Sequence, residues 1–185
     1  MKIVINECGS EAFYKEVVNI SGQYRFLLQN KNYKLKDYFK QFKVLLIAGC
    51  TVLVLLLIMC FAWGFKTFDY VAIIGLGLTM IMCCAYLYSL NRYKNAMMAE
   101  AGESTLYLDE EGVELNKKDA QVYRNSWNNI ECVVIAKEAL AFMPKMKTGM
   151  MICVERKYEE EILNWLKENQ AAIEIRNIRN KKRHS

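Results

Sequence analysis

Histidine is almost absent from this sequence, and no two cysteines have the spacing of a metal or redox motif. The one histidine is His184, beside the C-terminus. None of the seven cysteines forms a Cys-x-x-Cys pair, and four of them lie inside one apolar block. These absences argue against a zinc site or a disulfide framework. We interpret the cysteines as small buried hydrophobes of a reducing compartment.

Catalytic signatures are absent too. The sequence has no glycine-rich phosphate loop, no Gly-x-Ser-x-Gly elbow and no His-Glu-x-x-His motif. Its acidic runs, at 109–111 and 159–161, fall in an expected turn and at the start of an expected helix, where carboxylates have structural roles. We therefore predict that the protein is not an enzyme and has no catalytic, cofactor-binding or metal-binding residues. The first 42 residues are too polar for a signal peptide, so none is expected.

Charge is missing from two long stretches, 44–65 and 70–90. Each has about the 20 apolar residues that a helix needs to cross the hydrocarbon core of a bilayer. Only residues 66–69 separate them, which predicts a tight antiparallel hairpin of two transmembrane helices. Aromatic residues gather at the ends of these stretches, as they do at membrane interfaces: Trp63, Phe65, Phe68, Tyr70, Tyr86, Tyr88 and Tyr93.

The charges beside these stretches predict an orientation. Lysines precede the first stretch, and Arg92 and Lys94 follow the second, whereas the loop carries only Lys66 and Asp69. The positive-inside rule then predicts a multi-pass protein of the cell membrane with both termini in the cytoplasm. The cations expected to contact anionic lipid are Lys36, Lys40, Lys43, Arg92 and Lys94. The alternative, which the pattern favours, is that these cations only set the orientation. Because neither span holds an ionisable group, transport is not expected.

Residues 1–43 predict a small cytoplasmic segment before the membrane. The β-branched run at 3–5 predicts a short strand, and whether it joins a later sheet is left open. Ser10 is expected to cap a helix with Glu11 in its first turn. The apolar face of this helix would comprise Phe13, Val17, Ile20, Tyr24 and Leu27. Residues 33–42 mix aromatics with lysines, which favours a helix that enters the headgroup region.

After residue 95 the apolar residues alternate. We predict strands at 105–108, 113–115, 121–127, 130–136, 139–143 and 150–154. An amphipathic helix is predicted at 158–169, with the apolar stripe Ile162, Leu163, Trp165 and Leu166. The basic tail, 170–185, is expected to be mobile and to meet lipid or solvent rather than nucleic acid. The predicted fold is therefore an α+β membrane protein: a two-helix transmembrane hairpin plus an antiparallel PH-like β-barrel or sheet at 104–169, capped by a C-terminal helix.

This arrangement resembles the YcxB-like family of bacterial membrane proteins, which pair two membrane spans with a C-terminal PH-like domain. The resemblance lies in TLYLDEEGVEL at 105–115, SWNNIECVVIAKEALAFMPK at 126–145 and YEEEILNWLK at 158–167. The positions that match the family pattern are Asp109, Gly112, Ser126, Trp127, Ile130, Pro144 and Lys145. The strand predicted at 150–154 departs from that pattern. The resemblance implies a fold and no established activity.

Two functional hypotheses follow. In the first, the hairpin anchors the PH-like domain at the cytoplasmic face, where it binds an unidentified membrane or cytoplasmic protein, or a second copy, or regulates a membrane partner. The first hairpin turn is acidic, so phosphoinositide binding through a basic first loop is not predicted. Trp127 is expected to be a core residue rather than a recognition aromatic. In the second, a membrane-resident immunity or stress-protection factor acts against a toxin, as its small size and plain spans suggest.

Overall fold

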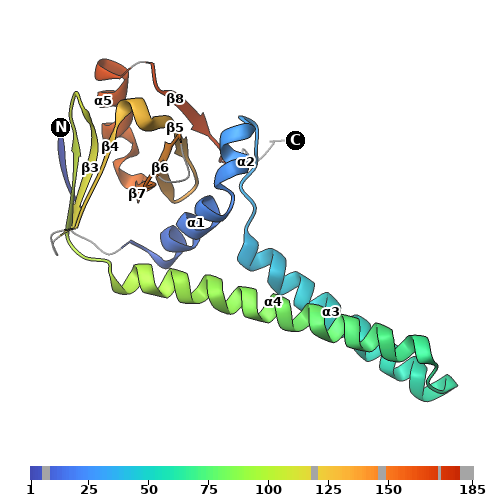
Figure 1. The fold of residues 1–185 in the computed structure, drawn as a ribbon. Helices are drawn as coiled ribbons and strands as arrows, with labels where there is room; N and C mark the ends of the chain where they lie inside the picture. The colour runs from blue at the N-terminus through green and yellow to red at the C-terminus, as the bar shows by residue number, and fades with distance from the viewer. Residues whose placement is uncertain (6–8, 118–120, 146–148, 171, 180–185) are drawn as a thin grey trace. The chain divides into compact units, whose positions relative to one another are not determined.

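The structure is a computed structural model that describes residues 1–5, 9–117, 121–145, 149–170 and 172–179. The chain divides into two units (Figure 1). The compact unit comprises Met1–Leu35 together with Ala96–Ser185, and the hairpin unit is Lys36–Asn95. The hairpin is therefore an insertion within one folded unit. The N-terminal segment belongs to the same unit as the C-terminal segment, rather than forming a piece of its own.

The hairpin unit consists of helix α3 (Tyr38–Trp63) and most of helix α4 (Thr67–Ala99). The stretches predicted as spans are helical except for Gly64 and Phe65, which follow the end of α3, and both helices begin before the predicted spans. α3 begins at Tyr38 because Asp37 caps it: the amide of Lys40 donates to Asp37 Oδ1 at 3.1 Å. The predicted loop 66–69 is shifted, since α4 already begins at Thr67. Gly64, with a φ of 80°, makes the turn after α3.

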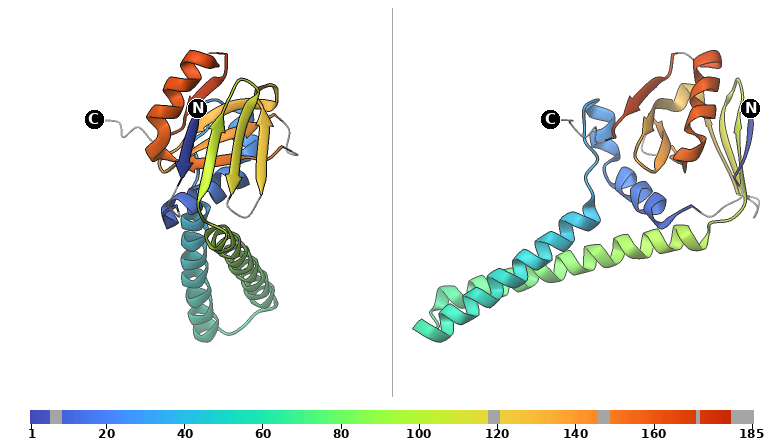
Figure 2. Two further views of the ribbon diagram at one scale, coloured as in Figure 1. Left: turned by 90° about the vertical axis from the view of Figure 1, so that its left-hand side faces the viewer. Right: turned by 180° about the vertical axis from the view of Figure 1, so that it is seen from behind.

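Sheet A contains four antiparallel strands in sequence order (Figure 2, left). They are β1 (Lys2–Ile5), β2 (Ser104–Leu108), β3 (Gly112–Lys117) and β4 (Val122–Ser126). Ile3 lies opposite Leu106 in the β1–β2 pair. The N-terminal strand therefore joins the later sheet, and the whole hairpin unit is inserted between two paired strands.

Sheet B has the order β7-β6-β5-β8. β5 (Ile130–Ile135), β6 (Ala139–Pro144) and β7 (Ile152–Glu155) are antiparallel, as predicted. β8 (Glu174–Asn177) was not predicted and runs parallel to β5, with Ile175 opposite Val133. The expectation of a mobile tail is thus wrong for these residues. The described residues form two four-stranded sheets and no closed barrel, which corrects the barrel alternative.

An inner core lies between the two sheets and helix α5 (Glu159–Asn169). Alternate side chains along the strands of sheet A point into this core, as Leu106 and Leu108 do in β2. Ile162 and Leu166 of the predicted stripe enter this core and are fully buried, whereas Leu163 and Trp165 pack at its margin. The amphipathic helix is therefore confirmed as a cover of the inner core.

An outer core lies on the other face of sheet B, beneath helices α1 (Glu11–Gly22) and α2 (Tyr24–Gln29). Ser10 caps α1 as predicted, because its Oγ accepts the Phe13 amide at 3.1 Å. The single predicted helix is broken at Gln23 into two. Along β5 and β6, successive residues alternate between the two cores, so sheet B is covered on both faces.

Candidate functional site

The hairpin unit presents large apolar side chains outward. In the most apolar window of α3 only 11% of residues are buried, and in that of α4 only 6%. Phe61 is 80% exposed and Phe68 is 78% exposed. A core helix of a soluble protein would bury most of such a window. Both helices are long and apolar enough to cross a membrane.

The two helices of the hairpin pack antiparallel in a definite register. The rings of Phe42 and Tyr86 lie 4.5 Å apart, and Gly49 faces Met80: a Cβ at Gly49 would come within 3.3 Å of the Met80 Cγ. A Cβ at Gly75 or Gly77 would meet nothing within 4 Å. Of these three glycines, Gly49 is therefore the one at which the two helices approach closely.

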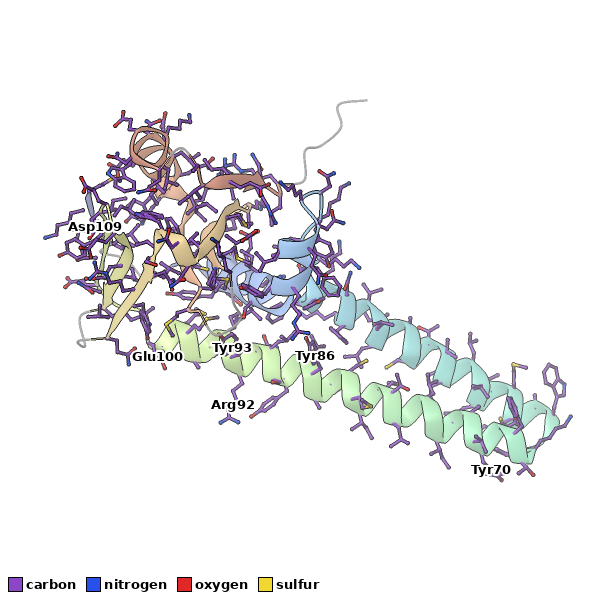
Figure 3. The ribbon with its side chains drawn as sticks, turned by 45° about the horizontal axis from the view of Figure 1, so that its top comes forward. Tyr70, Tyr86, Arg92, Tyr93, Glu100 and Asp109 are labelled. Carbon is purple, nitrogen blue, oxygen red and sulfur yellow. The ribbon has the colours of Figure 1, made fainter. Side chains whose placement is uncertain are left out.

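The expected lipid-contacting cations lie at the open end of the hairpin. Lys40 and Lys43 are exposed on α3, and Arg92 is exposed on α4, where its side chain points outward (Figure 3). The register of the two helices places Arg92 at about the level of Lys36, beyond Tyr86. Lys94 differs from the others because it is buried. The contact with lipid itself stays a prediction.

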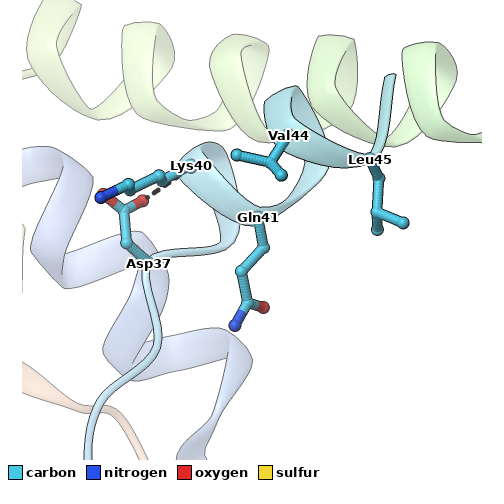
Figure 4. Close-up of a pocket in the computed structure, with 5 residues that line it drawn as sticks. All are labelled: Asp37, Lys40, Gln41, Val44 and Leu45. Carbon is cyan, nitrogen blue, oxygen red and sulfur yellow. Dashed lines mark hydrogen bonds between the residues drawn. The ribbon is translucent and has the colours of Figure 1, made fainter. Parts of the chain in front are cut away.

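A shallow, open hollow lies along the first turns of α3 (Figure 4). Its lining changes from polar to apolar along the helix: Asp37, Lys40, Gln41, Val44 and Leu45. This is the order in which a helix passing from water into a bilayer would present its side chains. The hollow has no catalytic grouping, since its one carboxylate caps the helix.

Both chain segments that lead to the hairpin are fixed in the outer core. Leu35, the last residue of the compact unit before the hairpin, packs against this core. Met97, which follows the hairpin, packs against the same core. The compact unit therefore holds the two ends of the insertion with one cluster of side chains.

A half-buried carboxylate fastens α1 over sheet B. Glu16 accepts backbone N–H groups from Lys137 at 3.1 Å, Glu138 at 2.6 Å and Ala139 at 2.8 Å, all in the β5–β6 turn. Burial raises the pKa of the Glu16 carboxyl above its usual value, against the opposing effect of these three amides. Sequence reasoning missed this residue, because a glutamate in the second turn of a helix has no distinguishing signal.

The residues that carry the family resemblance have structural roles. Asp109 Oδ1 accepts the amides of Glu111 and Gly112, both at 2.8 Å, which closes the first hairpin turn and lowers the Asp109 pKa. A Cβ on Gly112 would lie 2.1 Å from the Asn125 carbonyl oxygen, so only glycine fits. Trp127 is buried in the inner core and its Nε1 donates to the Asp109 carbonyl at 2.7 Å. The expectation that Trp127 is a core residue is confirmed.

Residues of both acidic runs make structural contacts. Within the first, Asp109 closes the turn and Glu111 pairs with Arg124. Within the second, Glu159 pairs with Arg156 and with Arg179 of the C-terminal segment. These two arginines hold the pKa of Glu159 below its usual value despite the opposing effect of burial, which is the largest single influence. The structural reading of both runs is confirmed for these residues.

The two described cysteines of the compact unit, Cys132 and Cys153, keep their protons at neutral pH. Burial raises the pKa of Cys132 to about 11 and that of Cys153 to about 12. At neutral pH both are therefore thiols rather than nucleophilic thiolates. Among the described residues, no group of three His, Cys, Asp or Glu side chains could hold a metal ion.

Comparison of the chain with protein-family models, with curated proteins and with solved structures finds no match. The resemblance to the YcxB-like family therefore stays a prediction that rests on the residues quoted above.

Proposed function

We propose that this chain is a two-span protein of the cell membrane whose compact unit is a PH-like domain on the cytoplasmic side. In this proposal the domain is not an enzyme. It binds a protein partner, or regulates a neighbouring membrane protein, from a fixed place at the bilayer. The observation that carries the proposal is the pair of outward-facing apolar helices inserted between strands β1 and β2.

The length of the uncharged intervals supports insertion into a bilayer. Residues 44–65 lie between Lys43 and Lys66, and residues 70–91 lie between Asp69 and Arg92. Each interval has about 22 residues, which as a helix spans roughly 33 Å, close to the ~30 Å of a hydrocarbon core. Two equal intervals in an antiparallel hairpin would put all the flanking charges at the two surfaces.

The insertion supports placing both ends of the hairpin on one side. β1 precedes the hairpin and β2 follows it, yet they pair along their whole length. A sheet cannot form across a bilayer, so the hairpin must leave and return on the same side. The excess of Lys and Arg beside its open end, compared with one lysine and one aspartate in its loop, favours the cytoplasm for that side.

The layout of the compact unit supports the PH-like assignment in part. Two stacked sheets with α5 against their shared core correspond to a partly open barrel capped by a C-terminal helix. Three features go beyond the PH-like layout. The first strand precedes the hairpin in the chain, α1 and α2 cover sheet B, and β8 adds a strand to sheet B. The outer face of sheet A has a row of side chains with mixed charge across its strands: Lys2, Tyr107, Glu114 and Arg124. We propose this row as the partner-binding face.

Reporter fusions in a bacterial host test the topology. Alkaline phosphatase matures only in an oxidising compartment. We expect it to be active when inserted after Lys66 and inactive when fused after Ser185, with the opposite pattern for green fluorescent protein. Activity of the C-terminal phosphatase fusion would contradict the proposal.

In-cell crosslinking tests the binding role separately. We expect the full chain to crosslink to a partner that a Tyr107→Ser/Arg124→Ser variant fails to capture, while a variant changed at Gln29→Ser, outside sheet A, still captures it. Equal capture by all three chains would contradict the assignment of this face.

A further inference from the structure

The last strand of the compact unit occupies an edge of sheet B. Among the described residues, β8 pairs only with β5, and the Ile178 amide after it donates to the Ile135 carbonyl at 3.0 Å. At the centre of this short strand is Arg176, which is only 6% exposed. A buried guanidinium is costly unless its donors are used, so its partners define what the strand does.

Arg176 bonds to the end of helix α2. Its Nη1 donates to the carbonyl oxygens of Leu27 at 2.6 Å and Leu28 at 3.0 Å. These carbonyls lie in the last turn of α2, where the helix supplies no N–H donors for its own carbonyl oxygens. Its Nη2 donates to Glu174 at 2.9 Å, and Glu174 also pairs with Lys31 at 2.9 Å. The hydrogen bonds from Arg176 and Lys31 lower the pKa of Glu174 to about 2.

The segment held in this way leads directly into α3. α2 has only six residues, too few to be stable as a helix alone. After it the chain turns back: Tyr33 stacks on Phe26 and its hydroxyl donates to Gln23 at 3.1 Å. Leu35 then packs in the outer core, two residues before the Asp37 cap of α3. The order of residues 24–35 therefore depends on contacts from elsewhere in the compact unit.

We propose that β8 is a releasable strap, and that Arg176 is the positioning residue through which it holds the segment leading into the first apolar helix. With the strap on the edge of β5, residues 24–35 are fixed. When β8 leaves that edge, α2 loses its cap and Lys31 loses its partner, while β5, β6 and β7 keep their own pairing. The C-terminal strand thereby controls how firmly the compact unit holds one end of the hairpin. This inference does not depend on membrane insertion.

Hydrogen exchange of the purified full chain tests the strap. The substitution Arg176→Met keeps most of the side-chain volume and removes the donors. We expect it to speed exchange of the amides of residues 24–35 at least tenfold and to leave those of β6 unchanged. Arg124→Met, the same change at an arginine paired with acids on sheet A, is the matched control and should leave residues 24–35 protected. Arg176→Lys should give an intermediate result, because lysine keeps the charge but not the planar donors.

Two results would overturn the proposal. If the amides of residues 24–35 exchange at the same rate in the Arg176→Met and Arg124→Met variants, Arg176 does not hold that segment. If β6 and residues 24–35 lose protection together, Arg176 supports the whole unit and no separate strap exists. Trypsin gives an independent reading, because Lys31, Lys34 and Lys36 are exposed. Cleavage there should accelerate in Arg176→Met alone.

Discussion

The two units of this protein direct their apolar side chains in opposite directions. In the compact unit Leu106 and Phe142 are completely buried, and the helices show polar outer faces. In the hairpin unit residues of the same types face outward, and Phe61 is 80% exposed. An apolar surface of that extent is rarely left in contact with water, which favours different surroundings for the two units. The contrast in exposure supports the proposal that the hairpin unit lies in a bilayer, independently of hydropathy.

The largest effect should come from a cavity in the compact unit. Phe142→Ala removes a ring that is fully buried in the inner core beside Trp127, with ring centroids 6.3 Å apart. We expect a loss of about 3–5 kcal/mol in the free energy of unfolding, followed by tryptophan fluorescence in urea. Phe61→Ala in the hairpin should leave that free energy unchanged. An equal loss from both substitutions would remove the contrast between the units.

A second pair of variants compares sites of equal exposure. Leu55 of α3 is 56% exposed and Val122 of β4 is 58% exposed. Lysine at position 55 should cost roughly 2.5–3.5 kcal/mol of membrane insertion, because it would lie near the centre of a bilayer. Lysine at position 122 should change unfolding by less than about 0.5 kcal/mol, because that site faces water. The measurement is the fraction of each variant in the membrane, and equal tolerance of both lysines would show that water surrounds both sites.

The smallest expected effects are changes in the stability of the protein as the pH is lowered. The compact unit holds two carboxylates, Glu174 and Glu16, whose pKa values are shifted in opposite directions. The pKa of Glu174 is lowered from 4.5 to about 2, so its stabilisation is present above pH 4.5 and is lost as pH falls toward 2. The pKa of Glu16 is raised, so its contribution has the opposite sign: it is present below pH 4.5 and is lost as pH rises through the raised value.

The direction of each pH effect can be checked by measuring the free energy of unfolding of the wild-type chain, Glu174→Gln and Glu16→Gln from pH 6 to pH 3. On acidification the wild-type chain should lose stability relative to Glu174→Gln and gain stability relative to Glu16→Gln. Shifts in the same direction for both variants would contradict the opposed environments of the two carboxylates.

Much of the fold could be predicted because its periodicities are local. Alternation in β2 and β3, the Asp109–Gly112 turn and the stripe of α5 each depend on a few neighbouring residues. The uncharged stretches identified α3 and α4 for the same reason. Their ends were less predictable: Asp37 and Asp69 act as caps through single hydrogen bonds.

What the sequence did not reveal depends on distant contacts. β5 and β6 are almost continuously apolar, which is typical of strands covered on both faces, yet only one covering helix was expected. The second cover, α1 and α2, comes from beyond the hairpin. β8 was missed because the sequence around Arg176 is typical of a solvated basic tail. The partners of Arg176 are the carbonyls of Leu27 and Leu28, nearly 150 residues earlier in the chain. The lipid contacts of Lys36, Lys40, Lys43 and Arg92 stay predictions.

The central claim is that one folded unit is assembled from both sides of an inserted hairpin. Replacing residues 36–95 by a flexible Gly-Ser linker of about 12 residues tests it most directly, because Leu35 and Met97 pack in the same outer core. We predict a water-soluble chain in which the amides of β1 and β2 remain protected from exchange. A chain that aggregates, or that folds with β1 unprotected, would contradict the claim.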